Sequence, residues 1–186
     1  YHAQSGVDAA LQLREEIGDP SRISRINIAT FKAAYDIIGK DPEKWRPATK
    51  ETADHSLPYI VGMALLEGKI DNQTYSQGKL RSGRNLDFVG RVVVKEDPAL
   101  TALYPDRGMA NRVTLETASG EVHSKEVDVP RGHPLAPMSR EEIEEKFRRL
   151  SRRKIPPRRA DEVLKSLWEL EKVKDVGELL RLCRVR

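Results

Sequence analysis

Pro58 restricts where the chain can begin a helix in the segment Glu51–Gly68, which has the sequence ETADHSLPYIVGMALLEG. A proline is tolerated in the first turn of a helix, where its missing N–H would have no partner, but it breaks a helix interior. Ser56 is therefore predicted to be the N-cap, with Pro58 at the second helical position and Gly68 as the stop. One apolar stripe along this helix is predicted from the spacing of Leu57, Val61, Ala64 and Leu65.

The head of this predicted helix carries three chemically able side chains, those of His55, Ser56 and Tyr59. Free backbone N–H groups and the positive end of the helix dipole would lie beside them, which suits a bound carboxylate. A phenol and an imidazole there could also transfer protons. The same residues would occur if the serine only capped the helix, the histidine bonded a loop and the tyrosine anchored the helix, so both interpretations stay open.

Three stretches of the chain resemble one known family, in the same order. They are YHAQSGVDAAL at residues 1–11, TADHSLPYIVGMALLEG at residues 52–68 and RGHPLAPMSREEIEEKF at residues 131–147. Together they resemble the C-terminal part of the 2-methylcitrate dehydratase family (MmgE/PrpD), which also includes cis-aconitate decarboxylase. The resemblance implies that the larger N-terminal helical portion of the family is absent from these 186 residues.

The resemblance implies a carbon–oxygen hydro-lyase that eliminates water from 2-methylcitrate, or from a near relative such as citrate, without a cofactor. Tyr59 matches the family's lid tyrosine and is predicted to be the catalytic proton donor or acceptor. His55 and Ser56 would orient a substrate carboxylate, and His2 would bind substrate at the border of the cleft. The family's cleft lysine, histidine and aspartate lie outside this sequence, so the chain alone is expected to have little or no turnover. Dehydration and decarboxylation stay unseparated, because the choice depends on cleft contacts from absent residues.

An α+β fold is predicted, in which a small, mainly antiparallel sheet is covered by helices in a two-layer lid domain and followed by C-terminal helices. Strands are expected from β-branched content, alternation and turn residues at positions 22–30, 88–95, 112–117 and 122–129. Helices besides the Pro58 helix are expected at positions 5–17, 31–38, 140–153, 161–170 and 176–182, and Ser139 with Glu142 is predicted to form a capping box before the third of these. The polar segment 70–85 is expected to be irregular. The predicted domains are the end of the helical domain (1–18), the α+β lid domain (19–135) and the C-terminal helical segment (136–186).

Composition argues against a metal centre, a disulfide and a membrane span. Cys183 is the only cysteine, and the four histidines, at positions 2, 55, 123 and 133, have no metal-ligand spacing. We therefore expect no metal and no cofactor. No apolar run approaches the roughly 18 residues that cross a bilayer, and no signal-peptide pattern precedes Ser5, so a cytoplasmic protein is expected.

Two surfaces raise the question of partners. Eight basic residues and no acidic one lie between Lys146 and Arg159, a pattern that could bind nucleic acid. Only Phe147 adds an aromatic ring, and acidic residues at positions 141–145 offer partners, so a salt-bridged surface is favoured. The apolar faces of the final helices predict a homodimer. Three classes stay open: a portion of a hydro-lyase, a non-catalytic interaction module of the same fold and a nucleic-acid-binding protein.

Overall fold

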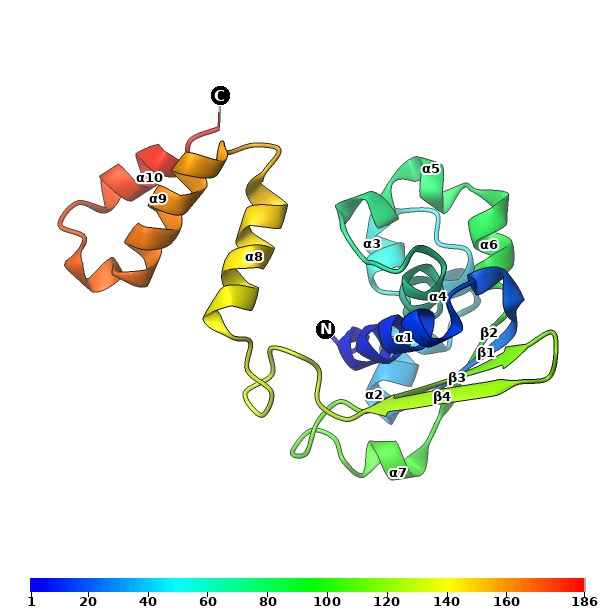
Figure 1. Ribbon diagram of the computed structural model, residues 1–186. Helices are drawn as coiled ribbons and strands as arrows, with labels where there is room; N and C mark the ends of the chain where they lie inside the picture. Colours follow the sequence, from blue (N-terminus) through cyan, green and yellow to red (C-terminus); the bar gives the residue numbers. More distant parts are fainter. Residues whose placement is uncertain (186) are drawn as a thin grey trace. The chain divides into compact units, whose positions relative to one another are not determined.

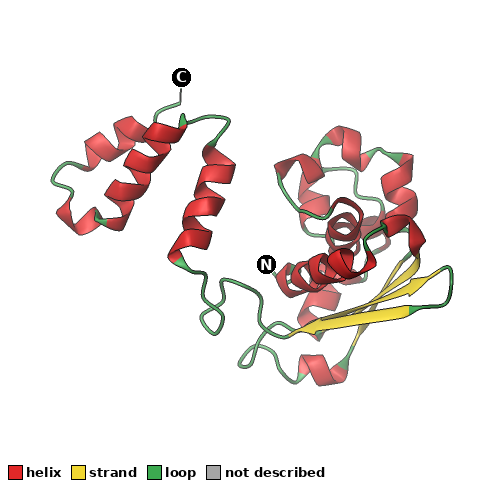
Figure 2. Cartoon of the chain, viewed as in Figure 1, coloured by secondary structure: helices red, strands yellow, loops and turns green. Residues whose placement is uncertain are grey.

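A computed structural model describes residues 1–185 of the chain, which fold as two compact units. Unit 1 is Tyr1–Ala136 and unit 2 is Pro137–Arg186. The strands belong to unit 1, whereas the secondary structure of unit 2 is helical (Figure 2). The predicted α+β class is confirmed, and the sheet has four strands that pair mostly antiparallel.

The sheet has the strand order β2-β1-β3-β4. Its strands are β1 (Ile23–Thr30), β2 (Val92–Glu96), β3 (Asn111–Thr117) and β4 (Val122–Val127). β3 pairs antiparallel with both β1 and β4, and a short turn joins β3 to β4. β1 and β2 run parallel, which requires the long, largely helical connection between them.

One face of the sheet is covered by α1 (Gln4–Ile17) and α4 (Leu57–Glu67), as Figure 1 shows. Alternate residues of β3 point to this face and are buried, and they are Asn111, Val113, Leu115 and Thr117. α4 is buried at every position from Leu57 to Leu65. The single apolar stripe expected for this helix is therefore corrected. The helix is apolar all round, as is typical of a helix that is enclosed on every side.

Two glycines let other helices approach α4 closely. A Cβ on Gly6 of α1 would lie 3.2 Å from Cγ2 of Val61 in α4. A Cβ on Gly62 of α4 would lie 3.1 Å from Cγ2 of Val89 in α6 (Gly83–Val89). The close packing of α1 and α6 against α4 therefore depends on having glycine, which has no side chain, at these two contacts.

Short helical turns fill the rest of unit 1, and two sequence expectations are corrected there. The segment 70–85, expected to be irregular, contains the 3-10 helix η4 (Asn72–Tyr75), α5 (Gln77–Leu80) and the start of α6. The strand expected at 88–95 begins at Val92, because Phe88 and Val89 complete α6. The remaining elements are α2 (Lys32–Ala34), a π-helical turn η2 (Tyr35–Gly39), α3 (Lys50–Asp54), α7 (Pro98–Thr101) and the 3-10 helices η1 (Pro20–Arg22) and η3 (Pro42–Trp45).

Unit 2 consists of α8 (Arg140–Ser151), α9 (Pro157–Trp168), a 3-10 turn η5 (Leu170–Lys172) and α10 (Val176–Cys183). The capping box predicted for Ser139 and Glu142 is present, with both reciprocal hydrogen bonds. α9 begins at Pro157, four positions before the expected start, because a proline fits the first helical position. No helix within residues 1–185 combines the length and apolar character needed to cross a bilayer.

The division between the units falls one residue from the boundary expected at 135/136. Within unit 1, residues of α1 belong to the same hydrophobic core as the sheet and α4. Residues 1–18 are thus packed as part of unit 1. Their assignment to the end of a helical domain stays a prediction, as do the roles given to residues 19–135 and 136–186.

Candidate functional site

Ser56 is the N-cap of α4, as predicted, and its hydroxyl is used entirely within the protein. Its Oγ accepts a hydrogen bond from the Tyr59 backbone N–H at 3.0 Å and donates one to the Lys44 carbonyl. The side chain is buried. Because a hydroxyl has only one hydrogen to donate, Ser56 has none left for a substrate carboxylate in this arrangement.

Tyr59 lies in the core, with 0% of its surface exposed. Its hydroxyl donates a hydrogen bond of 2.8 Å to the Thr74 carbonyl. Burial, with smaller contributions from Glu67 and Tyr75, raises the pKa of Tyr59 to about 12. The phenol therefore does not face an opening as expected, and proton exchange with a ligand would require the η4 turn to move. Its catalytic role stays a prediction that this geometry does not favour.

His55 lies at the C-cap of α3 and its side chain is exposed. Its Nδ1 is 2.6 Å from Oδ1 of Asp54 and 3.1 Å from the Glu51 carbonyl oxygen. The neighbouring Asp54 carboxylate places negative charge where a substrate carboxylate was expected. The orienting role predicted for His55 stays untested, and its surroundings oppose it.

His2 has different surroundings, because its half-buried ring lies against aromatic side chains. The centroid of its imidazole is 5.6 Å from that of Phe31 and 6.3 Å from that of Tyr104, both edge-to-face. Phe31 and Tyr104 are themselves stacked, with centroids 4.7 Å apart. Burial, followed by the positive charge of the terminal amine, lowers the pKa of His2 below 6.5. Burial therefore favours the neutral imidazole, the form that can accept a proton.

The backbone around His2 is held by hydrogen bonds, although chain termini commonly fray. Asn111 Nδ2 donates to the His2 carbonyl at 3.2 Å, and the Gln4 backbone N–H donates to the Tyr1 carbonyl at 3.1 Å. Sequence reasoning missed Asn111, Phe31 and Tyr104. The one available signal was Asn111 itself, a polar residue that occupies an inward position of the alternating strand β3.

The structure does not bring the four predicted site residues together. Within residues 1–185, no hydrogen bond, ion pair or ring contact joins His2 to His55, Ser56 or Tyr59. Ser56 and Tyr59 meet at the start of α4, and His2 lies beside the start of α1. Of these four side chains, that of His2 is partly exposed and has surroundings that favour its neutral form.

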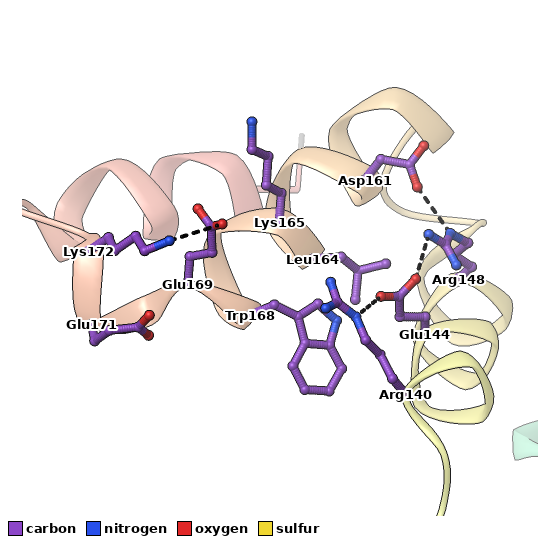
Figure 3. A pocket seen from close by; sticks show the side chains of 10 residues that line it. All are labelled: Arg140, Glu144, Arg148, Asp161, Leu164, Lys165, Trp168, Glu169, Glu171 and Lys172. Carbon is purple, nitrogen blue, oxygen red and sulfur yellow. Dashed lines mark hydrogen bonds and ion pairs between the residues drawn. The ribbon is translucent and has the colours of Figure 1, made fainter.

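A pocket in unit 2 is the main competing surface, and Figure 3 shows its side chains. They include four basic and four acidic residues, which are Arg140, Arg148, Lys165, Lys172, Glu144, Asp161, Glu169 and Glu171. Glu144 accepts from Arg140 at 2.9 Å and from Arg148 at 3.0 Å, and Arg148 also reaches Asp161 at 3.0 Å. Six of these eight charges pair with one another, and the Arg148–Asp161 pair links α8 to α9, so ion pairing within unit 2 accounts for most of the charge in this pocket.

The basic run from Lys146 to Arg159 is partly paired as well. Arg148 bonds Glu144 and Asp161, and Arg158 lies 3.4 Å from Glu162. These pairs, at two of the eight basic residues, are of the kind expected for a salt-bridged surface, and the choice against a nucleic-acid site stays a prediction. In the part of the chain that the structure describes, no three His, Cys, Asp or Glu side chains gather as a metal site would require.

The α+β unit and its helical tail match a known class of domain. The family model described as the MmgE/PrpD C-terminal domain matches residues 1–170, which covers unit 1 together with α8 and α9. The resemblance noted in the sequence is confirmed: this chain belongs to the MmgE/PrpD family.

Curated relatives agree with that membership. The chain is 33% identical over 181 residues to a 2-methylcitrate dehydratase of Cupriavidus necator, an alignment covering 88% of this chain and 35% of the relative. It is 31% identical over 141 residues to a 2-methylcitrate dehydratase of Escherichia coli (strain K12), covering 72% of this chain and 29% of the relative. A cis-aconitate decarboxylase-like protein, oryM, of Aspergillus oryzae is 27% identical over 162 residues, an alignment that covers 86% of this chain and 32% of the relative. The chain thus spans about a third of the length of these relatives.

Proposed function

We propose that this chain is the C-terminal portion of a hydro-lyase that removes water from a small tricarboxylic acid of the 2-methylcitrate type. The match of residues 1–170 to the MmgE/PrpD C-terminal domain carries the proposal. The names of the bacterial relatives, both dehydratases, support the general kind of reaction. A cytoplasmic location and independence from metal ions and organic cofactors belong to the same proposal.

His2 is the residue of this chain that we assign to the substrate. Elimination of water needs a base to take a proton from the carbon next to a carboxylate, and an acid to assist the departing hydroxide. A half-buried imidazole with a lowered pKa suits the first task. One ring nitrogen would accept the proton as the C–H bond breaks, the C=C bond forms and the C–O bond breaks. The acid that converts the hydroxide to water would come from outside this chain.

The other three predicted site residues are given different roles in the proposal. The hydrogen bonds of Ser56 and Tyr59 support structural roles at the start of α4. The exposed His55, beside Asp54, is a weaker candidate for orienting a substrate carboxylate. These three assignments predict that only a change at His2 abolishes turnover without first loosening the fold.

A decarboxylase is the second candidate, because one relative is named as cis-aconitate decarboxylase-like. The two reactions differ in their products. A dehydratase forms an unsaturated tricarboxylate from 2-methylcitrate, whereas a decarboxylase releases carbon dioxide from cis-aconitate. Measuring both products with one preparation separates the candidates.

The proposal is tested by replacing the matched segment of the Cupriavidus necator relative with this chain. We expect this hybrid to form the unsaturated product from 2-methylcitrate, followed by its ultraviolet absorbance. We expect the 186-residue chain alone to give no turnover above buffer, and the unaltered relative is the control. A folded hybrid that binds 2-methylcitrate without converting it would contradict the assignment. A rate for the chain alone near that of the unaltered relative would contradict the predicted incompleteness.

A further inference from the structure

Three buried polar side chains lie at the start of α1 and at the adjoining ends of β1 and β3. Ser5 belongs to the first turn of α1, Thr30 ends β1 and Asn111 begins β3, and each has 0% of its surface exposed. Thr30 and Asn111 are register partners across β1 and β3. Apolar residues could fill such positions without the cost of desolvating polar atoms, so the hydrogen bonds of Ser5 and Asn111 indicate a specific arrangement, whereas Thr30 Oγ1 has no partner among the described residues.

The Asn111 amide is the centre of this cluster. Its Nδ2 lies 2.7 Å from Ser5 Oγ, 3.2 Å from the His2 carbonyl oxygen and 3.4 Å from the Met109 carbonyl oxygen. Ser5 Oγ in turn donates to the same Met109 carbonyl. The amide therefore joins the residues around the start of α1, including His2, to the residues at the start of β3.

The orientation of this amide follows from its neighbours. Nδ2 faces two carbonyl oxygens and a hydroxyl oxygen, whereas Oδ1 has no hydrogen-bond partner among the described residues. Turning the amide over would place Oδ1 against two carbonyl oxygens that can only accept hydrogen bonds. The NH₂ group of Asn111 is thus fixed toward the His2 carbonyl oxygen. This hydrogen bond restricts the backbone of the residue that carries the imidazole.

Aromatic rings hold the imidazole from the other side. Phe31 directly follows β1, and Tyr104 follows α7, so the Phe31–Tyr104 stack is built from two separate elements. Both rings meet the His2 ring edge-to-face. The backbone of His2 is therefore held by β3 while its ring is held by residues that follow β1 and α7.

We infer that Asn111 is a positioning residue for His2, acting with the Phe31–Tyr104 stack to keep the imidazole in one orientation. Asn111 is fully buried, so it acts through His2 and does not touch a ligand. The inference rests on the proposed function, in which His2 meets the substrate. Its structural content is testable in the 186-residue chain without any turnover.

The test measures the histidine side chains of the chain by long-range ¹H–¹⁵N NMR over a pH titration. In the unaltered chain, His2 should titrate below 6.5 and show nuclear Overhauser effects to the Phe31 ring. In Asn111→Ala, the pKa of His2 should rise toward 6.5 and those effects should weaken severalfold, with the other three histidines unchanged. An unaltered His2 titration and ring contact in this variant would overturn the inference.

Asn85→Ala is the matched control, since Asn85 is also buried and its amide also donates to a backbone carbonyl, that of Lys79. It should lower stability and leave His2 unchanged; a shift of His2 equal to that in Asn111→Ala would overturn the inference. If Asn111→Ala does not fold, hydrogen exchange in the unaltered chain tests the inference. The Asn111 side-chain amide protons should then exchange with water many-fold more slowly than those of Asn72, and equal rates would overturn the inference.

The proposed function and the positioning role can fail separately. If His2→Gln leaves the hybrid enzyme fully active, the function assigned to His2 fails while the NMR result still decides how His2 is held. If His2 is needed for turnover, Asn111→Ala should lower kcat more than it changes KM and move the acid limb of the pH profile upward. An unmoved acid limb would overturn the positioning role.

Discussion

Tyr59 should ionise at a higher pH than an ordinary tyrosine, because burial, with smaller contributions from Glu67 and Tyr75, disfavours its charged form. Its pKa is raised from 10.0 to about 12, so its neutral form is favoured in the folded state. The resulting stability is fully present below pH 10 and is lost as the pH rises toward 12. At 1.36 kcal/mol per pKa unit, the loss reaches at most about 3 kcal/mol. Urea unfolding at pH 8 and pH 11, with an ultraviolet titration of the tyrosines, measures it.

Tyr59→Phe provides the comparison for that prediction. It should remove much of the loss of stability between the two pH values and eliminate the tyrosine titration near pH 12. Tyr104→Phe is the control, because Tyr104 is 38% exposed. Equal pH dependence of stability in Tyr59→Phe and in the unaltered chain would contradict the buried placement of the phenol.

Tyr59 and His2 show which properties of single residues can be predicted from the sequence and which depend on contacts with distant residues. Ser56, Pro58 and Gly68 act on neighbours a few positions away, so the helix they delimit could be predicted correctly. The Asn111–His2 hydrogen bond joins residues 109 positions apart, and no local pattern indicates it. The fate of the Tyr59 hydroxyl likewise depends on a turn 15 positions away.

Gly6 controls how closely α1 lies on α4, and it supplies a prediction at the level of elements. Gly6→Leu should push the helices apart, because even a Cβ would lie 3.2 Å from the Val61 side chain. Overpacking typically costs about 1–3 kcal/mol, partly offset by the better helix propensity of leucine, worth about 0.5–1 kcal/mol. We therefore expect a net loss of about 1–2 kcal/mol in the free energy of unfolding, measured by urea titration.

Gly78→Leu is the matched control for the packing of α1. Gly78 also lies in a helix, α5, but a Cβ there has no atom within 4 Å. This variant should be neutral or slightly more stable. A loss of stability in Gly78→Leu as large as that in Gly6→Leu would show that helix contact is not the cause.

Elements bounded by strong local signals could be predicted from the sequence, and those decided by packing could not. α8 was found because Ser139 and Glu142 form a capping box, and β3 and β4 because alternation and a turn mark a hairpin. The strand expected at 88–95 was misplaced because Phe88 and Val89 suit a strand locally, yet they complete a helix packed on α4. Tertiary contacts decided that boundary.

The ion pairs that Glu144 makes within α8 should weaken in acid. Hydrogen bonds from Arg140 and Arg148 lower the pKa of Glu144 below its ordinary 4.5. The stability that this carboxylate contributes is present above pH 4.5 and is lost as the pH falls through the lowered pKa. Trp168 lies under the Arg140 guanidinium at 4.8 Å, so its fluorescence reports the contact.

Glu144→Gln should show the low-pH fluorescence already at pH 7, because it removes the charge but keeps the shape. Glu145→Gln, the adjacent residue of α8, is the control and should follow the unaltered chain. If the fluorescence of Glu144→Gln at pH 7 matched that of the unaltered chain, the carboxylate would not be what holds Arg140 against Trp168.

For the whole molecule, we predict that two copies associate through the final helices. Few residues of unit 2 are buried, whereas large apolar side chains of α9 and α10 are exposed, including Leu167, Val176 and Leu180. Covering such a face is favourable at about 25 cal/mol per Å² of apolar surface. Light scattering across micromolar concentrations should therefore detect a dimer.

Leu180→Glu should shift that equilibrium toward monomer, since Leu180 in α10 is 65% exposed. Leu135→Glu is the matched control: Leu135 is 67% exposed and lies in unit 1. A strict monomer over the whole concentration range, or equal effects of both variants, would contradict association through the final helices.

The central claim is that His2, and not the phenol of Tyr59, is the group of this domain that meets the substrate. The most direct measurement is kcat for 2-methylcitrate in the hybrid enzyme carrying His2→Gln or Tyr59→Phe. His2→Gln should lower kcat by roughly 100-fold or more, the usual contribution of a positioned proton-transfer group, whereas Tyr59→Phe should retain most of its activity once folded. The opposite result, an active His2→Gln and a folded but inactive Tyr59→Phe, would contradict the claim.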